Sequence, residues 1–226
     1  MASVQDPNPR PLPGEPLALD LLNTQWLASA GPADLLATPE GTRTWLASAG
    51  VAAAPAHGTR EALVTARQAI RDVLTGQGGT TARDRLNEVL GHGCLRLSLG
   101  PGTTTTQALE VDDPAWQPAV MAAVNVLDLL EQAPDRIRQC QHPACVLWFY
   151  DTTRNGTRRW CSMASCGNRA KAHRHYDRVK KTRLPGRPAV PAGTCPVGSG
   201  PVAVSRRSSA GSRSSSGRAQ VMYEFA

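Results

Sequence analysis

Four of the six cysteines have the spacing of a metal site. They form two close pairs, Cys140-x4-Cys145 and Cys161-x4-Cys166, separated by fifteen residues. Two such pairs are the ligand pattern of a tetrahedral four-sulfur zinc site, in which each pair holds one side of the ion. Two disulfides or four unrelated thiols are the alternatives, and disulfides require an exported chain. We therefore expect one structural Zn²⁺, with a closed ligand set that leaves no position for a catalytic water.

Three histidines lie close enough in sequence to replace a cysteine ligand: His142, His173 and His175. His142 lies inside the first pair and the other two lie beyond the last cysteine, so the four-cysteine set is favoured. The sequence has no glycine-rich phosphate loop, no HExxH helix and no nucleophile elbow. We expect no catalytic residues and no enzymatic activity.

The fifteen residues between the cysteine pairs predict a β-hairpin. The first strand is the apolar run Val146–Tyr150, which is rich in β-forming side chains. The turn lies in Asp151–Gly156, which contains an Asn-Gly pair. Thr157–Trp160 would return to Cys161 as the second strand. The hairpin would then carry one cysteine pair at each end.

A helix is expected after Cys166. Ala172, Tyr176 and Val179 are spaced as one apolar stripe. A basic stripe lies on the far side of the same helix: Lys171, Arg174, Arg178 and Lys181. A knuckle, a hairpin and a helix that begins at the metal form a treble-clef zinc finger, so the chain is predicted to be α+β.

Two sets of motifs resemble known families. Arg158–Met163 followed by Cys166-Gly167-Asn168-Arg169 closely resembles the CGNR zinc finger, and Pro16–Thr24 with Asp34–Gly41 resembles the ABATE domain that usually precedes it. The resemblance covers roughly residues 14–182. It implies a stress-induced transcriptional regulator whose finger binds DNA and whose N-terminal domain binds an unidentified ligand.

The net charge of +7 conceals a division along the chain. Residues 1–135 carry 8 Lys and Arg against 15 Asp and Glu, whereas residues 136–183 carry 12 against 2. An acidic half joined to a basic finger is typical of a nucleic-acid-binding module carried by another domain. The alternative is that the cations only solvate a surface.

The expected DNA contacts come from both parts of the finger. They are the basic helix stripe, Lys171, Arg174, Arg178 and Lys181, and the hairpin cations Arg154, Arg158 and Arg159. Arg169 is a further expected nucleic-acid contact, but it lies about 60° from the centre of the apolar stripe, so we expect it to be partly structural, near the metal. Binding of RNA or of a protein remains open. Since one finger offers one reading helix, tight specific binding would need a second copy of the chain.

The remaining chain divides into four segments. Residues 1–13 are expected to form a flexible arm, 14–135 an N-terminal domain stable alone, 136–183 the finger, and 184–226 a disordered basic tail that contains Cys195. Helices are expected at 38–48, 60–75, 81–90 and 114–132. Strands are expected at 94–99, half-buried with Cys94 inside, and at 107–111. Periodicity does not decide whether 17–22 is helix or strand.

Asp20, Asn23 and Thr24 are polar residues in apolar surroundings. They form either local caps and turns, the favoured interpretation, or the polar floor of a ligand pocket. Met1–Glu15 lacks the apolar segment of a signal peptide, and no run of the sequence is long enough to cross a membrane. We therefore expect a cytoplasmic location and no membrane partner.

Overall fold

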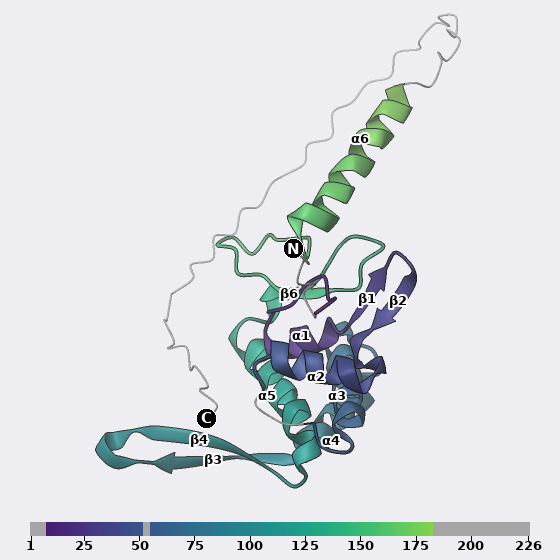
Figure 1. The fold of residues 1–226 in the computed structure, drawn as a ribbon. Helices are drawn as coiled ribbons and strands as arrows, with labels where there is room; N and C mark the ends of the chain where they lie inside the picture. Colours follow the sequence, from purple (N-terminus) through teal and green to yellow (C-terminus); the bar gives the residue numbers. More distant parts are fainter. Residues whose placement is uncertain (1–7, 52–54, 183–226) are drawn as a thin grey trace, which may run out of the picture. The chain divides into compact units, whose positions relative to one another are not determined.

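The computed structural model describes residues 8–51 and 55–182 (Figure 1). The tail predicted to be disordered, with Cys195, lies outside these residues. The chain divides into two compact units, residues 1–176 and 177–226. The second unit contributes only the end of helix α6 (Asn168–Thr182) to the described part. None of the described helices is long and apolar enough to cross a membrane.

The helices of the first unit begin and end close to the predicted positions. Those that precede the paired cysteines are α1 (Leu17–Leu22), α2 (Pro39–Ser48), α3 (Thr59–Thr75), α4 (Gly79–Leu90) and α5 (Gln117–Gln132). The Thr38 hydroxyl caps α2 by accepting a hydrogen bond from the Gly41 N–H at 3.0 Å. Gly76 ends α3 with a φ of +69°, a conformation that favours glycine. The segment 17–22, which periodicity left undecided, is a helix.

The main hydrophobic core lies among these helices. α3 packs against α1, α4 and α5, and α1 also packs against α5. Large side chains fill the space between them, among them Trp45, Leu63, Ile70, Val89 and Val126, each with at most 1% of its surface exposed. Burial of each such side chain contributes about 1.5–3 kcal/mol. The strand pairs are therefore attached to a closely packed helical core.

Three antiparallel strand pairs complete the fold of the described residues. They are β1 (Gln25–Ala28) with β2 (Gly31–Asp34), β3 (Gly93–Leu99) with β4 (Thr105–Val111), and β5 (Ile137–Gln139) with β6 (Trp148–Tyr150). Together with the helices and the cysteine cluster that follows them, they confirm the predicted α+β class.

The hairpin of β3 and β4 differs from the prediction. Leu97 and Leu99 are each 71% exposed, and Cys94, expected inside, is also exposed. Only the base of the hairpin contacts the helices, where Leu109 packs on the core, and Figure 1 shows the strands extending away from them. The alternation of apolar residues correctly predicted a two-faced strand, but it carries no information on whether the apolar face has a partner.

The strand pairing near the cysteines also differs from the prediction. β6 pairs with β5 upstream, in register Ile137 to Tyr150, and residues 157–160 are not a strand. The cause is the buried Asp151, whose carboxylate accepts hydrogen bonds from Thr153 N at 3.0 Å and Arg158 N at 2.8 Å. These bonds hold residues 151–158 in a closed loop. The first cysteine pair therefore forms the connection of the β5–β6 hairpin.

Residues 8–13 do not form the flexible arm that the proline content predicted. Arg10 is 4% exposed and forms an ion pair with Asp20, and it donates to Ser48 Oγ at 2.8 Å. Leu12 packs against the cysteine cluster. A buried guanidinium needs acceptors, and Asp20 supplies one that is itself buried.

Asn23 joins the helical core to the finger. Its Nδ2 donates to the Trp148 carbonyl at 2.9 Å, and its Oδ1 accepts from the Trp148 N–H at 2.8 Å. Trp148 belongs to the main hydrophobic cluster, and Glu15 accepts a second strand N–H, that of Tyr150. This shared packing argues against the expectation that residues 14–135 are stable alone.

Asn23→Ala should therefore destabilise the whole first unit. The substitution leaves the Trp148 N–H and carbonyl without partners in a buried site, at a cost of about 2–4 kcal/mol. Denaturant unfolding of the zinc-loaded chain measures the loss. Asn87→Ala is the control, because Asn87 is exposed on α4. Equal stability of the two variants would contradict the role of Asn23.

Candidate metal centre

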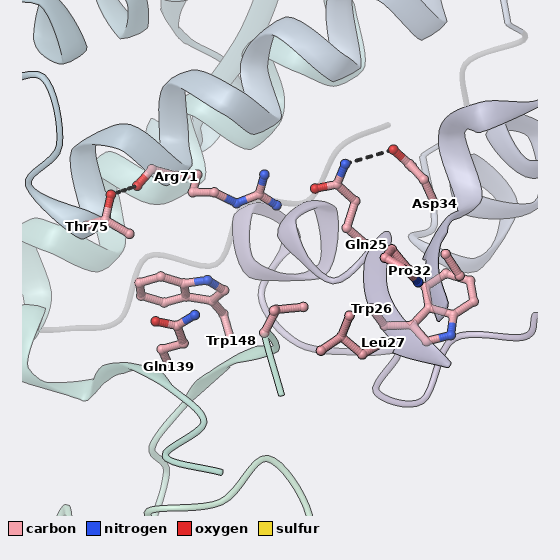
Figure 2. A pocket seen from close by; sticks show the side chains of 11 residues that line it. Gln25, Trp26, Leu27, Pro32, Asp34, Arg71, Thr75, Gln139 and Trp148 are labelled. Atoms are coloured by element: carbon pink, nitrogen blue, oxygen red, sulfur yellow. Dashed lines mark hydrogen bonds between the residues drawn. The ribbon is translucent and has the colours of Figure 1, made fainter. Parts of the chain in front are cut away.

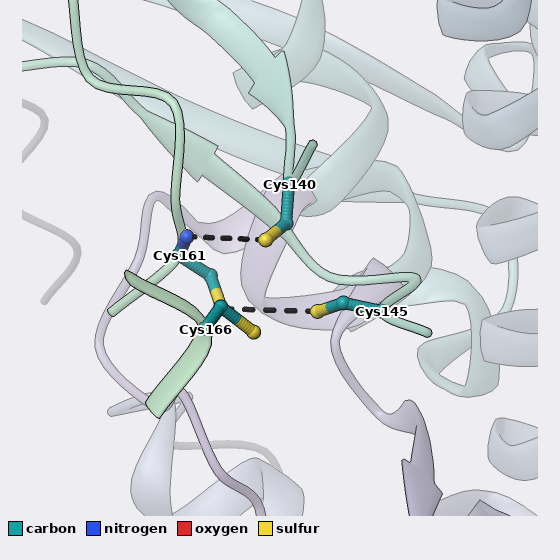
Figure 3. Close-up of side chains that lie close together, drawn as sticks. All are labelled: Cys140, Cys145, Cys161 and Cys166. Atoms are coloured by element: carbon teal, nitrogen blue, oxygen red, sulfur yellow. Dashed lines mark hydrogen bonds between the residues drawn. The ribbon is translucent and has the colours of Figure 1, made fainter. Parts of the chain in front are cut away.

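The four cysteines meet at one point, supplied by three segments (Figure 3). Cys140 follows β5 directly and two residues separate Cys145 from β6, so both lie in the hairpin connection. Cys161 lies three residues after the loop 151–158 that Asp151 closes. Cys166 lies in a π-helical turn, Met163–Gly167, that leads directly into α6. Their sulfur atoms all lie within 4.8 Å of one another.

The distances between the sulfur atoms fit a tetrahedral zinc ion. Sγ of Cys161 lies 3.7 Å from Sγ of Cys145 and 3.6 Å from Sγ of Cys166. Four sulfurs about 2.3 Å from a central zinc would be about 3.8 Å apart, whereas a disulfide requires about 2.05 Å. The cysteines are thus arranged as ligands of one zinc ion, and the disulfide alternative does not fit.

The electrostatics of the site call for a cation. Cys140, Cys161 and Cys166 are buried and Cys145 is half-buried. A hydrogen bond from Cys161 lowers the pKa of Cys145 to about 5, while burial raises the pKa of Cys166 to about 11. Four thiolates cannot coexist in this volume unless a metal ion neutralises them. Among the described histidines none joins the cluster, and His142 Nδ1 instead accepts the Ala144 N–H at 3.2 Å.

Arg158, predicted to contact DNA, instead stabilises the loop between β6 and Cys161. Its guanidinium lies 4.2 Å from the centre of the Phe149 ring, and its Nε donates to the Trp160 carbonyl at 3.0 Å. A further hydrogen bond reaches the Cys161 carbonyl, and Glu15 lies 3.6 Å away as an ion-pair partner. The side chain is therefore committed to protein contacts.

The other cations near the metal are engaged to different degrees. Arg169 donates to Sγ of Cys166 at 3.7 Å, in agreement with the expected contact beside the metal. Arg159 donates to Gln141 Oε1 at 2.6 Å and lies over the Trp160 ring. Arg154 is exposed in the loop that follows β6.

Helix α6 is exposed rather than packed along one face. Ala172 and Tyr176, expected to form an apolar contact stripe, are exposed, and Tyr176 is 66% exposed. Lys171, Arg174 and Arg178 are exposed as well, and Lys181 lies in the last turn of the helix. Anchoring through Cys166 fixes the start of the helix, so beyond Ala170 its described side chains extend into solvent.

The three residues considered for a pocket floor have protein partners. Asp20 accepts the Trp45 Nε1–H at 2.9 Å and the Gly14 N–H at 2.7 Å. Asn23 binds the Trp148 backbone, and Thr24 Oγ1 accepts from Arg67 at 2.7 Å while donating to the Leu21 carbonyl. Only the bond between Thr24 and Leu21 is the local turn contact that the sequence favoured, since the partners Trp45, Trp148 and Arg67 are distant in sequence.

A cavity of about 440 Å³ lies beside these residues instead, and sequence reasoning missed it (Figure 2). It lies among β1–β2, α3 and the β5–β6 hairpin. No local pattern marks it, because its lining comes from three distant segments: Gln25, Trp26, Leu27, Pro32, Ala33, Asp34, Arg71, Thr75, Gln139, Val146 and Trp148.

Two family models match the chain, in the order that the motifs predicted. The model described as ABATE, "Putative stress-induced transcription regulator", matches residues 15–132, and that of the CGNR zinc finger matches residues 136–179. Neither is a family of enzymes. No curated protein shows significant similarity to the chain.

Cys161→Ser should abolish stoichiometric zinc. Structural zinc contributes about 10–16 kcal/mol to the folding of small finger peptides, so its loss should unfold the metal loop and lower the thermal midpoint. Metal analysis and a thermal scan measure both effects. Cys94→Ser is the matched control, since Cys94 is an exposed thiol outside the cluster. Full zinc content in the Cys161 variant would refute the assigned ligand set.

Arg158→Ala should destabilise the finger by about 2 kcal/mol, through loss of the ring contact and of hydrogen bonds to carbonyl groups. Arg154→Ala, an exposed arginine of the same loop, should change stability little. Chemical unfolding followed by Trp fluorescence compares the two. A stable Arg158 variant would show that this arginine is a surface cation.

Proposed function

We propose that this chain, which belongs to the ABATE family, regulates transcription by binding duplex DNA through its zinc finger. The observation that supports the proposal most directly is α6. Over Asn168–Thr182 it carries six Lys and Arg against one Asp, and its described side chains are exposed beyond Ala170. A helix of like charges without a packed face is costly unless a polyanion neutralises it.

The metal gives this helix a fixed starting point. Cys166 lies in the turn that opens α6, and Cys140 and Cys145 tie the same ion to the β5–β6 hairpin. A reading helix fixed at one end is a common way to enter the major groove. Lys171, Arg174, Arg178 and Lys181 are our candidates for the groove and adjacent phosphates.

The loop cations contribute less than the sequence predicted. Arg154 and Arg159 remain candidates for phosphate contacts, with Arg169 beside the metal, whereas Arg158 is committed to the protein. If about four cations reach phosphates, the logarithm of affinity should fall with the logarithm of salt with a slope of about −3.6, at roughly 0.9 per phosphate.

Reversing Arg174 and Arg178 to Glu should abolish DNA binding while zinc content and fold persist. Fluorescence anisotropy with duplex DNA, measured over a salt series, tests this expectation. Arg43→Glu with Arg60→Glu is the matched control, because these exposed arginines of the N-terminal half pair with Glu40 and Glu61. Retained affinity in the α6 variant, or binding without salt dependence, would reject the groove-binding helix.

The second candidate function is binding of single-stranded RNA, which is tested by measuring the affinity for RNA at the same salt concentration. The exposed Tyr176 and the cations Arg154 and Arg159 would suit stacking and phosphate contacts on a single strand. A preference for RNA over duplex DNA would favour that function.

Sedimentation of the DNA complex tests whether a second copy of the chain joins it.

A further inference from the structure

The cavity beside the finger has the size and lining of a small-molecule site. Its volume of about 440 Å³ lies within the range of such sites. Most of the lining is apolar, including Trp26, Leu27, Pro32 and Trp148. A few polar groups face the same space, and Figure 2 shows Arg71 and Trp148 among the side chains that line it. A flat organic molecule would fit this combination.

Arg71 is the unusual member of the lining. It is half-buried on α3, and burial together with the charge of Arg67 lowers its pKa. Among the described residues its guanidinium has no hydrogen-bond acceptor and no ion-pair partner. Half-buried guanidinium groups ordinarily find acceptors, so this one has donors available for a ligand.

The nearest carboxylates are already engaged. Asp34 accepts both Nη atoms of Arg67 at 2.7 Å and Gln25 Nε2 at 2.9 Å. Asp72 accepts Gln68 Nε2 at 2.7 Å and forms an ion pair with Arg85 at 3.1 Å. The Asp34 charge is balanced by Arg67, so Arg71 leaves one positive charge at the cavity.

We propose that this cavity binds a small organic carboxylate with a flat apolar body, held by Arg71 at the carboxylate and by Trp148 and Leu27 along the body. A guanidinium binds a carboxylate through two parallel hydrogen bonds, which neutral isosteres cannot reproduce. The amide groups of Gln25 and Gln139 supply further polar contacts.

The cavity adjoins the metal centre, so a ligand bound in it could act on the finger. A regulatory role for that ligand rests on the proposed function. Gln139 immediately precedes Cys140, and Val146 immediately follows Cys145. A ligand in the cavity would contact both neighbours of the first cysteine pair together with α3 of the core. Its binding should therefore stabilise the joined state of core and finger.

Binding is tested on the full zinc-loaded chain with two matched probe pairs. Benzoate and indole-3-acetate carry the carboxylate, and benzamide and indole-3-acetamide replace it with a neutral amide. Titration calorimetry and thermal shift should show binding of the acids, with at least about tenfold weaker binding of the amides. Acetate, which lacks the flat body, should bind more weakly than benzoate.

Two variants test the residues. Arg71→Gln should weaken both acids about tenfold or more, whereas Arg83→Gln, an exposed arginine on α4, should leave them unchanged. Leu27→Ala should weaken both aromatic acids and leave acetate unaffected, which keeps the test informative if the Arg71 variant is unstable. No binding of either acid at millimolar concentration, equal binding of the amides, or unchanged binding to the Arg71 variant would overturn the proposal.

DNA binding is measured separately, so the two proposals fail independently. If the acids bind as expected and duplex DNA does not, the site stands and the DNA function is wrong. If DNA binds and the acids do not, the ligand site is wrong and the finger stands.

Discussion

The double hydrogen bond between the Asn23 amide and the Trp148 backbone is the contact on which the arrangement of this protein depends. It joins the end of α1 to a strand more than a hundred residues later, in a site without solvent. An amide that donates and accepts at one backbone position mimics a neighbouring strand. β6 therefore has β5 on one side and Asn23 on the other, so the metal hairpin is part of the helical core.

Part of the positive charge of the finger is engaged in contacts within the protein. Several of its cations stabilise loops rather than face solvent. Arg136 donates to the Asp151 carbonyl at 2.9 Å, and Arg138 donates to the Gly156 carbonyl at 2.9 Å. With Arg158 they hold the chain between β6 and Cys161, a stretch with little regular structure to satisfy its backbone. The charge available to an external anion is therefore concentrated on α6.

Features set by local chemistry were predictable from the sequence. The paired spacing identified the cysteines that the structure brings together, and the Thr38 cap with Pro39 marked the start of α2. Features set by distant partners were not. Val146–Tyr150 was recognisable as a strand, but its pairing with β5 follows from the hydrogen bonds of Asp151. The leucines of β3 follow a clear alternation, yet only the packed structure shows that they face solvent. The docking of Arg10 depends on Asp20, and nothing near Arg10 in sequence indicates it.

The long separation between Asn23 and Trp148 also determines the order in which the protein can assemble during synthesis. While the ribosome is still making the first hundred residues, Asn23 has no strand to bind, and the surface that later receives Trp148 is uncovered. Each helix forms early through its own local contacts, whereas the packing of α5 on α1 and the closure of this long loop must wait for the later part of the chain. The cysteines emerge with that strand, so zinc delivery coincides with the last step of folding. A nascent chain that meets no zinc would therefore leave an apolar face of its core open to chaperones and proteases.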